Sequence, residues 1–205
     1  MKRLSLILLV VLASVSAWGQ NVSNDASVIK RNGIKSLTIT NCIGNEGCFS
    51  EYYEFNACGE ISLEIPPMVN SFAKMEYDKN CRLSVIWVMN HSPKTDSIWR
   101  KAVYNYSDKD SILVANYYYE NNKLTEKTDS YKISKVKAEP KDAVKDKQGR
   151  IIQHSQGDLN YPCGIHYKGS HTFKYTYNKN GLIAKAMVYN SKNELVVNLE
   201  YEYKK

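Results

Sequence analysis

A short phrase recurs along this chain and constrains its fold more than any other feature. The phrase is an apolar residue, a variable residue, an aromatic residue, then Asn, Asp or Ser, two mostly polar residues, Gly or a substitute, a variable residue, and Ile or Leu. Seven copies begin at Tyr53, Met75, Tyr104, Tyr117, Ala143, Tyr175 and Met187. The fourth copy is one residue short, and the fifth has Lys145 in place of the aromatic residue. The recurrence predicts a series of similar units that stack on one another.

Each copy of the phrase has the chemistry of a β-hairpin turn. Asn, Asp or Ser at the first turn position favours a type I turn, because its side chain can bond to the backbone ahead of it. The fourth turn position then requires a left-handed backbone. The residues at that position that adopt or tolerate this conformation are Gly59, Gly149, Gly181, Asn193 and Asp110. Cys81 departs from the rule, which predicts a different turn or a disulfide there. The shortened copy predicts a tight turn at Asn121 and Asn122.

The segments between these turns have the pattern of β-strands. Residues 173–177, 195–203 and 61–65 alternate apolar and mostly polar side chains with a period of two, which is typical of strands with one buried face. No segment after the leader has a sustained helical period. We therefore predict an all-β fold, an antiparallel meander of repeated β-hairpins. The sheet is expected to be an open twisted sheet or a curled half-barrel, and a closed lipocalin-like barrel is the alternative.

The start of the chain has the layout of a secretory signal peptide. Lys2 and Arg3 precede an apolar run and then small residues. The run is shorter than the roughly 20 residues that a membrane span needs, so we expect no stable membrane span. The predicted organisation is a signal peptide over residues 1–19, a flexible lead-in over 20–32 and a single β-hairpin repeat domain over 33–205. The protein is expected to be exported to the periplasm, the cell surface or the extracellular space.

The net charge of +7 comes almost entirely from lysine. Base readout in nucleic acids relies on arginine, and no arginine- or lysine-rich block is present, so no nucleic-acid partner is expected. The positive charge is expected to keep strand surfaces soluble and to discourage edge pairing. The alternative is that it holds the protein near acidic glycans or lipid headgroups.

The five cysteines allow disulfides in an exported protein, but their odd number leaves at least one free or paired with another chain. They are Cys42, Cys48, Cys58, Cys81 and Cys163. Cys42 and Cys48 enclose the loop-like sequence IGNEG, so they are candidates for closing a small loop. The rest of the pairing is left open by the sequence.

Chemically reactive residues are sparse. Cys163, His166 and His171 have the spacing of three zinc ligands within a long turn-rich insertion from His154 to His171, but no fourth ligand is evident. A Cys–His nucleophile pair at the same place has no catalytic signature around it. Acidic residues such as Glu51 and Glu54 are expected to be solvated. We therefore predict that the protein is not an enzyme and needs no cofactor, and keep the Cys163 group as a weak metal candidate.

The aromatic content offers a binding hypothesis. The chain has 16 tyrosines and three tryptophans, and sugars stack on aromatic faces. The candidate binding residues are Trp87, Trp99, Tyr118 and Tyr167. The competing interpretation is that these rings fill cross-strand pairs, where tyrosine is favoured for structural reasons.

The copies YTYNKNGLI, MEYDKNCRL and YEFNACGEI resemble the YD repeats of bacterial Rhs-type proteins, whose phrase is roughly Tyr-x-Tyr-Asp-x-x-Gly-x-Leu. The resemblance covers about residues 53–203, and the chain is also similar to small exported proteins of Bacteroidota-like bacteria. It implies a sheet of consecutive hairpins with structural motif residues, and it transfers no catalytic residue. The expected function is a non-catalytic binding or interaction protein of the bacterial envelope, with a protein or a glycan as its partner. The alternatives are a carbohydrate-binding surface protein, a metal- or thiol-dependent enzyme centred on Cys163, or a purely structural surface component.

Overall fold

The computed structural model describes residues 26–44, 46–67, 69–91, 96–107, 111–128, 131–134, 140, 142–160 and 166–205. The predicted signal peptide and Cys163 lie outside these ranges. The elements are α2 (Ala26–Arg31), β1 (Ser36–Ile43), β2 (Gly47–Phe55), β3 (Ile61–Ile65), β4 (Ser71–Tyr77), β5 (Leu83–Asn90), β6 (Ser97–Asn105), β7 (Ser111–Glu120), β8 (Lys123–Lys127), β9 (Tyr131–Ser134), β10 (Val144–Lys145), β11 (Ile151–Gln156), β12 (Leu159–Asn160), β13 (His166–Tyr167), β14 (His171–Tyr177), β15 (Ile183–Tyr189) and β16 (Leu195–Lys204). Among the described residues, no helix is long and apolar enough to cross a membrane.

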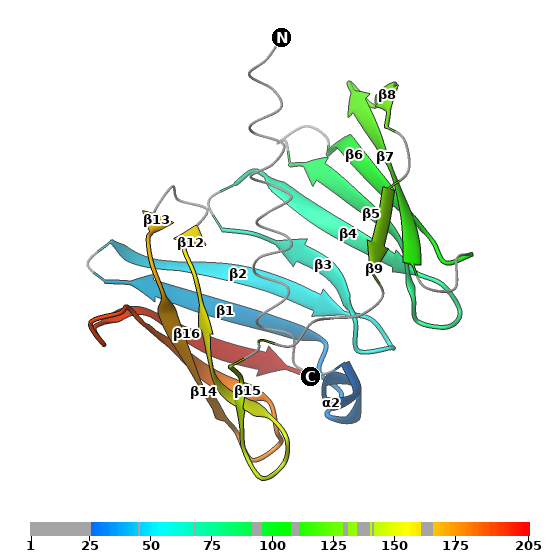
Figure 1. Ribbon diagram of the computed structural model, residues 1–205. Coiled ribbons are helices and arrows are strands. Elements are labelled where there is room, and N and C mark those ends of the chain that lie inside the picture. Colours follow the sequence, from blue (N-terminus) through cyan, green and yellow to red (C-terminus); the bar gives the residue numbers. More distant parts are fainter. Residues whose placement is uncertain are drawn as a thin grey trace.

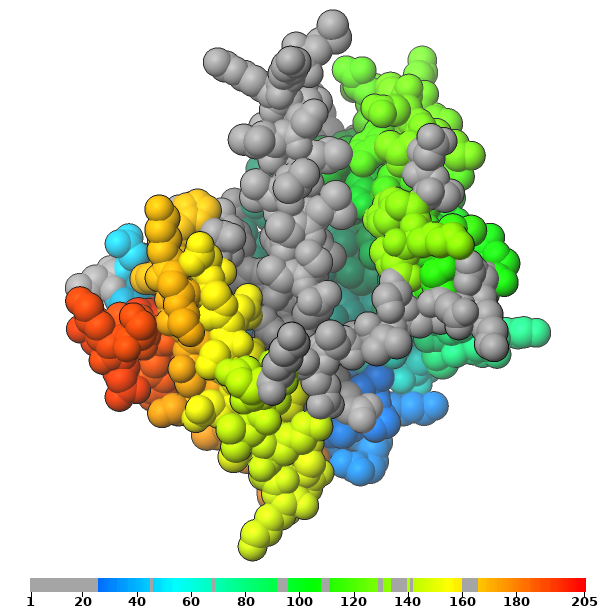
Figure 2. Space-filling model, in the orientation of Figure 1, coloured from blue at the N-terminus to red at the C-terminus, as the bar shows by residue number. Residues whose placement is uncertain are grey.

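Fourteen of the strands form one antiparallel sheet with the order β10-β11-β14-β15-β16-β1-β2-β3-β4-β5-β6-β7-β8, and β9 pairs with β7 beside β8. The predicted all-β hairpin fold is confirmed. No pairing between described strands joins β8 or β9 to β10, so the sheet is open and the closed barrel is not formed. The sheet is strongly curved, with β5–β9 as one wall, β11–β16 as the other and β1–β4 between them (Figure 1). Figure 2 shows the green and the yellow walls on opposite sides of the molecule.

The sheet order differs from a simple meander at one place. The first strand pairs with the last over eight residues, from Ser36 with Lys204 to Ile43 with Val197. The break in the sheet therefore falls in the middle of the chain, between β9 and β10. Because β1 lies between β2 and β16, it joins the hairpins of the two halves of the chain into one surface.

Five copies of the phrase fold into the same turn. In each, the first residue donates its backbone N–H to the carbonyl of the fifth at 2.8–3.0 Å, and its side-chain Oδ1 accepts the N–H groups of the third and fifth residues at 2.8–3.1 Å. These first residues are Asn56, Asp78, Asp146, Asn178 and Asn190. The fourth position is left-handed in all five, with φ between 59° and 83°. The predicted turn chemistry is confirmed for these copies.

Two turns depart from the common sequence of the phrase, one at Cys81 and one at Asn121 and Asn122. Cys81 keeps the common turn, with φ 59°, and also forms a disulfide with Cys58 in the preceding turn. Asn121 and Asn122 form the predicted tight turn, with φ 50° and 61°. In the third copy β6 ends at Asn105, two residues before the turn position that the phrase predicts, and Asp110 lies outside the described residues.

Tyrosine hydroxyls link neighbouring hairpins. Tyr77 and Tyr177, the aromatic residues of two copies of the phrase, and Tyr203, which follows the last copy, each donate their hydroxyl to a backbone carbonyl at the start of the adjacent strand. The acceptors are Ile61 at 2.7 Å, Ile151 at 2.7 Å and Ile183 at 2.8 Å. A partly buried carbonyl is thereby given a hydrogen-bond donor. The bond is made by two copies of the phrase, whereas Phe55 in the first copy has no hydroxyl to donate.

Two disulfides are formed by four of the cysteines. Cys42 and Cys48 are bonded across the β1–β2 hairpin, with Cα atoms 4.1 Å apart, which confirms that they close a small loop. Cys58 and Cys81 join two successive turns, with Cα atoms 5.9 Å apart. The state of Cys163 stays a prediction, because it lies outside the described residues.

A short helix closes one end of the sheet. Ile29 of α2 is buried with Ile34 and Leu182, and the helix lies against the turn that contains Gly59. Residues 26–31 therefore correct the expectation of a flexible lead-in over 20–32. A six-residue helix has too few turns to show a helical period in the sequence. Its stability comes from packing against the rest of the chain.

The buried face of the sheet is the concave one. Its core combines residues of the central strands and of the C-terminal wall, such as Leu37, Tyr53 and Tyr175, with Leu159 of the β12–β13 ribbon. That ribbon continues from β11 and β14 and packs onto the core. The predicted turn-rich insertion from His154 to His171 is therefore wrong in part: both histidines lie in strands and are buried.

Candidate functional site

A continuous row of cross-strand partners runs across the concave face. The row contains Leu37, Tyr53, Glu64, Ala73, Val88, Arg100, Tyr118 and Glu126, one residue from each strand from β1 to β8. Partners in a sheet point to the same side. The row places polar groups at two points, on β2–β3 and on β6–β7, with the small apolar side chains Ala73 and Val88 between them.

Glu51 is the centre of the polar group on β1–β3. It is 3% exposed, so the expectation that this carboxylate is solvated is wrong. Its two oxygens accept hydrogen bonds from Asn41 Nδ2 at 3.0 Å and from Tyr53 Oη at 2.5 Å. Burial raises the pKa of Glu51, and these two bonds oppose the shift.

Glu64 lies on the neighbouring strand β3, beside Tyr53 in the row. Burial and, to a smaller extent, the charge of Glu51 raise its pKa to about 7. Two buried carboxyls of like charge avoid ionising together. The Glu64 carboxyl is therefore partly protonated near neutral pH and can donate as well as accept hydrogen bonds.

Several buried polar atoms on this face have no hydrogen-bond partner in the described part of the chain. They are Asn41 Oδ1, Tyr201 Oη and both ring nitrogens of His154. Asn41 is 0%, His154 3% and Tyr201 9% exposed. Burying a polar group without a partner costs about 1–3 kcal/mol, so a fold rarely keeps several such groups on one face unless something binds them. These atoms mark the concave face as a candidate binding site.

Aromatic rings form the side of the site that lies on the C-terminal wall. His154 stacks on Phe173 at 4.9 Å and on Tyr175 at 5.6 Å between ring centroids. Burial lowers the pKa of His154, with Asp142 opposing the shift, so the ring favours its neutral form. Tyr201 lies close enough to both Tyr175 and Glu51 to interact electrostatically with them, which links the aromatic side of the site to its acidic side.

The four predicted binding residues are not brought together. Tyr118 lies in the concave row as the partner of Arg100. Trp87 pairs with Lys101 in the alternate register, on the convex face, where Lys101 lies 4.3 Å from its ring and Glu76 accepts its Nε1–H at 2.7 Å. Trp99 occupies a bulge of β6. Tyr167 lies on the β13 ribbon and meets His171 edge-on at 6.0 Å.

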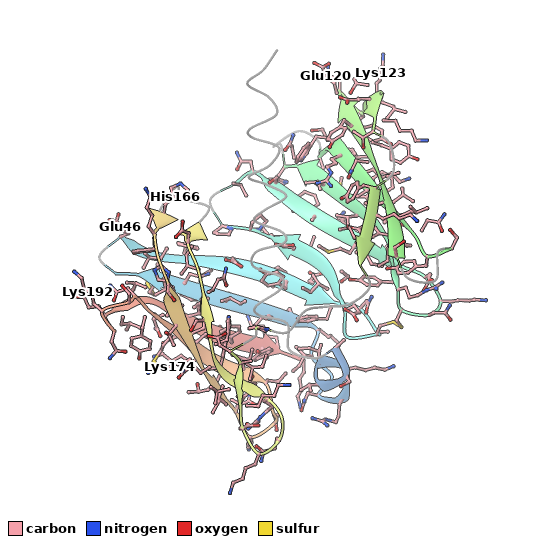
Figure 3. The ribbon with its side chains drawn as sticks, viewed as in Figure 1. Glu46, Glu120, Lys123, His166, Lys174 and Lys192 are labelled. Carbon is pink, nitrogen blue, oxygen red and sulfur yellow. A yellow bond between two sulfur atoms is a disulfide. The ribbon has the colours of Figure 1, made fainter. Side chains whose placement is uncertain are left out.

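The weak metal candidate stays a prediction, because Cys163 lies outside the described residues. His171 is buried and its Nδ1 lies 3.2 Å from the carbonyl of Gly157, whereas His166 is exposed near the tip of the ribbon (Figure 3). Within the described ranges, no group of three or more His, Cys, Asp or Glu side chains is arranged to hold a metal ion.

Four residues of the candidate site were not predicted from the sequence: Glu51, His154, Tyr201 and Arg100. A signal for Glu51 is present in β2, where Phe49, Glu51, Tyr53 and Phe55 share one face by period two. An acid on the apolar side of a strand is a candidate for burial. For the other three, one strand alone does not reveal which residues of distant strands lie beside them.

No family model matches the chain, and no curated protein matches it. Among solved structures, the chain is similar to a porin-like protein from Bacteroides uniformis, with 8% sequence identity, covering 83% of this chain and 98% of that chain, at a TM-score of 0.29. A similarity at this level supports no conclusion about shared fold or function.

Proposed function

We propose that this protein is an exported, non-catalytic binding protein of the bacterial envelope that holds a saccharide on its concave face. The observation that carries the proposal is the set of buried polar atoms without partners on that face, Asn41 Oδ1, Tyr201 Oη and the ring nitrogens of His154. A ligand that supplies hydrogen bonds to these atoms removes the cost of their burial.

A saccharide suits the chemistry of this face. Its hydroxyls both donate and accept, which matches carboxyl, amide, phenol and imidazole groups placed side by side. Its C–H faces suit the rings of Phe173 and Tyr175 and the apolar floor at Ala73 and Val88. Binding sites that combine a mostly apolar lining with a few placed polar groups are typical for small ligands. The YD-like hairpins supply the rigid support, and the lysine-rich surface suits the envelope.

The test uses the mature chain, residues 20–205, on a glycan array and in titrations with the saccharides it captures. His154→Phe and Tyr201→Phe keep the shape of each ring but remove the unpartnered polar atoms. We expect both variants to bind several-fold more weakly than the unchanged chain. We also expect both to unfold at a higher temperature, because each removes a buried polar group that the free protein leaves unsatisfied.

The matched control is Tyr189→Phe, at a ring that lies against Lys174 on the convex face. Among the described residues, the hydroxyl of Tyr189 donates to the Met187 sulfur, at 3.5 Å. This change should alter neither binding nor stability. Capture of a protein partner without any glycan, or a loss of stability in both His154→Phe and Tyr201→Phe with binding unchanged, would contradict the proposal.

A further inference from the structure

Arg100 is a buried cation that has no counter-ion among the described residues. Its side chain lies on the concave face of β6 and the residue is 7% exposed. Nε and Nη2 both donate to Oδ1 of Asn116, at 3.1 and 2.6 Å, and Asn116 is itself 5% exposed. Within the described residues no carboxylate forms an ion pair with Arg100.

The positive charge of Arg100 is not neutralised by its neighbours in the described part of the sheet. In the row across the sheet, Glu126 is two strands away on one side and exposed, and Glu64 is three strands away on the other. Its closer neighbours are apolar or uncharged, such as Val88, Ala102 and Tyr118. A buried charge is normally paired, because its desolvation costs several kcal/mol when nothing compensates it. Arg100 is thus prepared for an anion that the described chain does not supply.

The chemistry of the guanidinium defines that anion. Arginine has five N–H donors in a planar fork, and Asn116 takes two of them. The remaining donors suit an oxyanion bound through two parallel hydrogen bonds, for which a carboxylate has the matching geometry. The acidic group at Glu64 lies three strand spacings away, or about 14 Å along the sheet, so one extended ligand can reach both points.

We propose that the saccharide bound on the concave face is acidic, and that Arg100 binds its carboxylate while Asn116 holds the guanidinium in place. This inference rests on the proposed function and deepens it by naming the ligand class. It predicts a division of the face, with hydroxyls bound near Glu51 and the anionic group bound on β6–β7.

The experiment compares three probes with the mature chain: galactose oligomers, galacturonic acid oligomers of the same length, and inorganic phosphate. With the same linkage, the two saccharides differ only at C6, where a carboxylate replaces the hydroxymethyl group, so the ratio of their affinities isolates the anion. We expect the acidic oligomer to bind at least about tenfold more tightly than the neutral one, because hydrogen bonds to a charged group are stronger than those between neutral groups.

Two variants separate binding from folding. Arg100→Gln should lower the affinity for the acidic oligomer to about that for the neutral one, so that the ratio of the two affinities falls close to one. Asn116→Asp supplies an internal counter-ion, so it should keep or raise the melting temperature while also removing the preference. A purely structural role for Arg100 would leave the ratio unchanged in Asn116→Asp.

The outcomes are distinct. Equal binding of both oligomers, unaffected by either variant, would overturn the acidic-ligand proposal and leave the binding function standing. Binding of phosphate that depends on Arg100, with neither oligomer bound, would show a general anion site, and would overturn both this proposal and the saccharide function. Absence of binding by all three probes would also overturn both.

Discussion

Gly59→Ala should destabilise the protein by about 3–5 kcal/mol, far more than the same change in an equivalent turn. Gly59 has φ 83°, and a left-handed alanine costs about 1–2 kcal/mol. In addition, a Cβ at this position would overlap the backbone carbonyl of Ala26, so α2 must move. Displacing α2 exposes Ile29, whose burial contributes about 1.5–3 kcal/mol. Urea unfolding of the mature chain with its disulfides intact measures the effect.

The matched control is Gly149→Ala, in the same turn position with φ 77° and no atom within 4 Å of the added Cβ. It should cost only the conformational term of about 1–2 kcal/mol. An Ile29→Ala background tests the cause: if α2 is already loosened, Gly59→Ala should add less than it does alone. Equal costs for Gly59→Ala and Gly149→Ala would show that α2 does not dock as described.

Glu64→Gln should stabilise the protein at pH 8 by up to about 3 kcal/mol and have little effect near pH 4.5. Burial and the charge of Glu51 raise the folded-state pKa of Glu64 from 4.5 to about 7, and each pKa unit corresponds to about 1.4 kcal/mol. The folded state therefore holds this proton more tightly than the unfolded state. The resulting stability is full below about pH 4.5 and is lost as the pH rises through 7. Glutamine keeps the size of the side chain and has no charge to desolvate.

The quantity to measure is the difference in unfolding free energy between the unchanged chain and the variant from pH 4.5 to 8. His154 also makes stability depend on pH, because its lowered pKa makes the stability fall as the pH drops below 6.5. Both proteins contain His154, so its effect cancels in the difference. Glu54→Gln is the control, because Glu54 lies on the adjacent strand β2 but is exposed. A difference for Glu64→Gln that stays constant across this pH range would contradict the buried, protonated state of its carboxyl.

The local structure of this protein is readable from its sequence because the turn chemistry is local. An Asn or Asp that accepts two backbone N–H groups, followed three residues later by a left-handed residue, specifies the hairpin without help from the rest of the chain. The turn at Asn178 and the turn at Asn56 are therefore alike, although they lie in different halves of the chain. The same local logic predicts the tight turn at Asn121 and Asn122.

The arrangement of the hairpins is not readable in this way. The pairing of β1 with β16 joins residues more than 150 positions apart, from Ser36 with Lys204 onward, and no turn residue encodes it. Likewise, α2 is too short to show a helical period in the sequence. The helix is held in place by the burial of Ile29 against Ile34 and Leu182, which a local sequence pattern does not reveal.

The candidate site depends on this non-local arrangement. Alternation within β2 identifies Glu51 and Tyr53 as neighbours on one face, but the approach of Tyr201 depends on the β1–β16 pairing. Arg100 and Glu64 fall in one row only after the registers of three hairpins are known. Of the four predicted binding residues, Tyr118 lies in this row. The sequence predicts it as a binding residue from its aromatic ring and not from its place in the sheet.

Mapping the bound ligand by NMR tests binding at the concave face. The mature chain, labelled with ¹⁵N, is titrated with a galacturonic acid oligomer while backbone amide shifts are followed. We expect saturating shifts at concave-row positions such as Glu64, Val88 and Arg100, with the amides around Lys174 on the convex face unchanged. Shifts confined to the convex face, or no saturable shifts at all, would contradict the claim that the concave face binds an acidic saccharide.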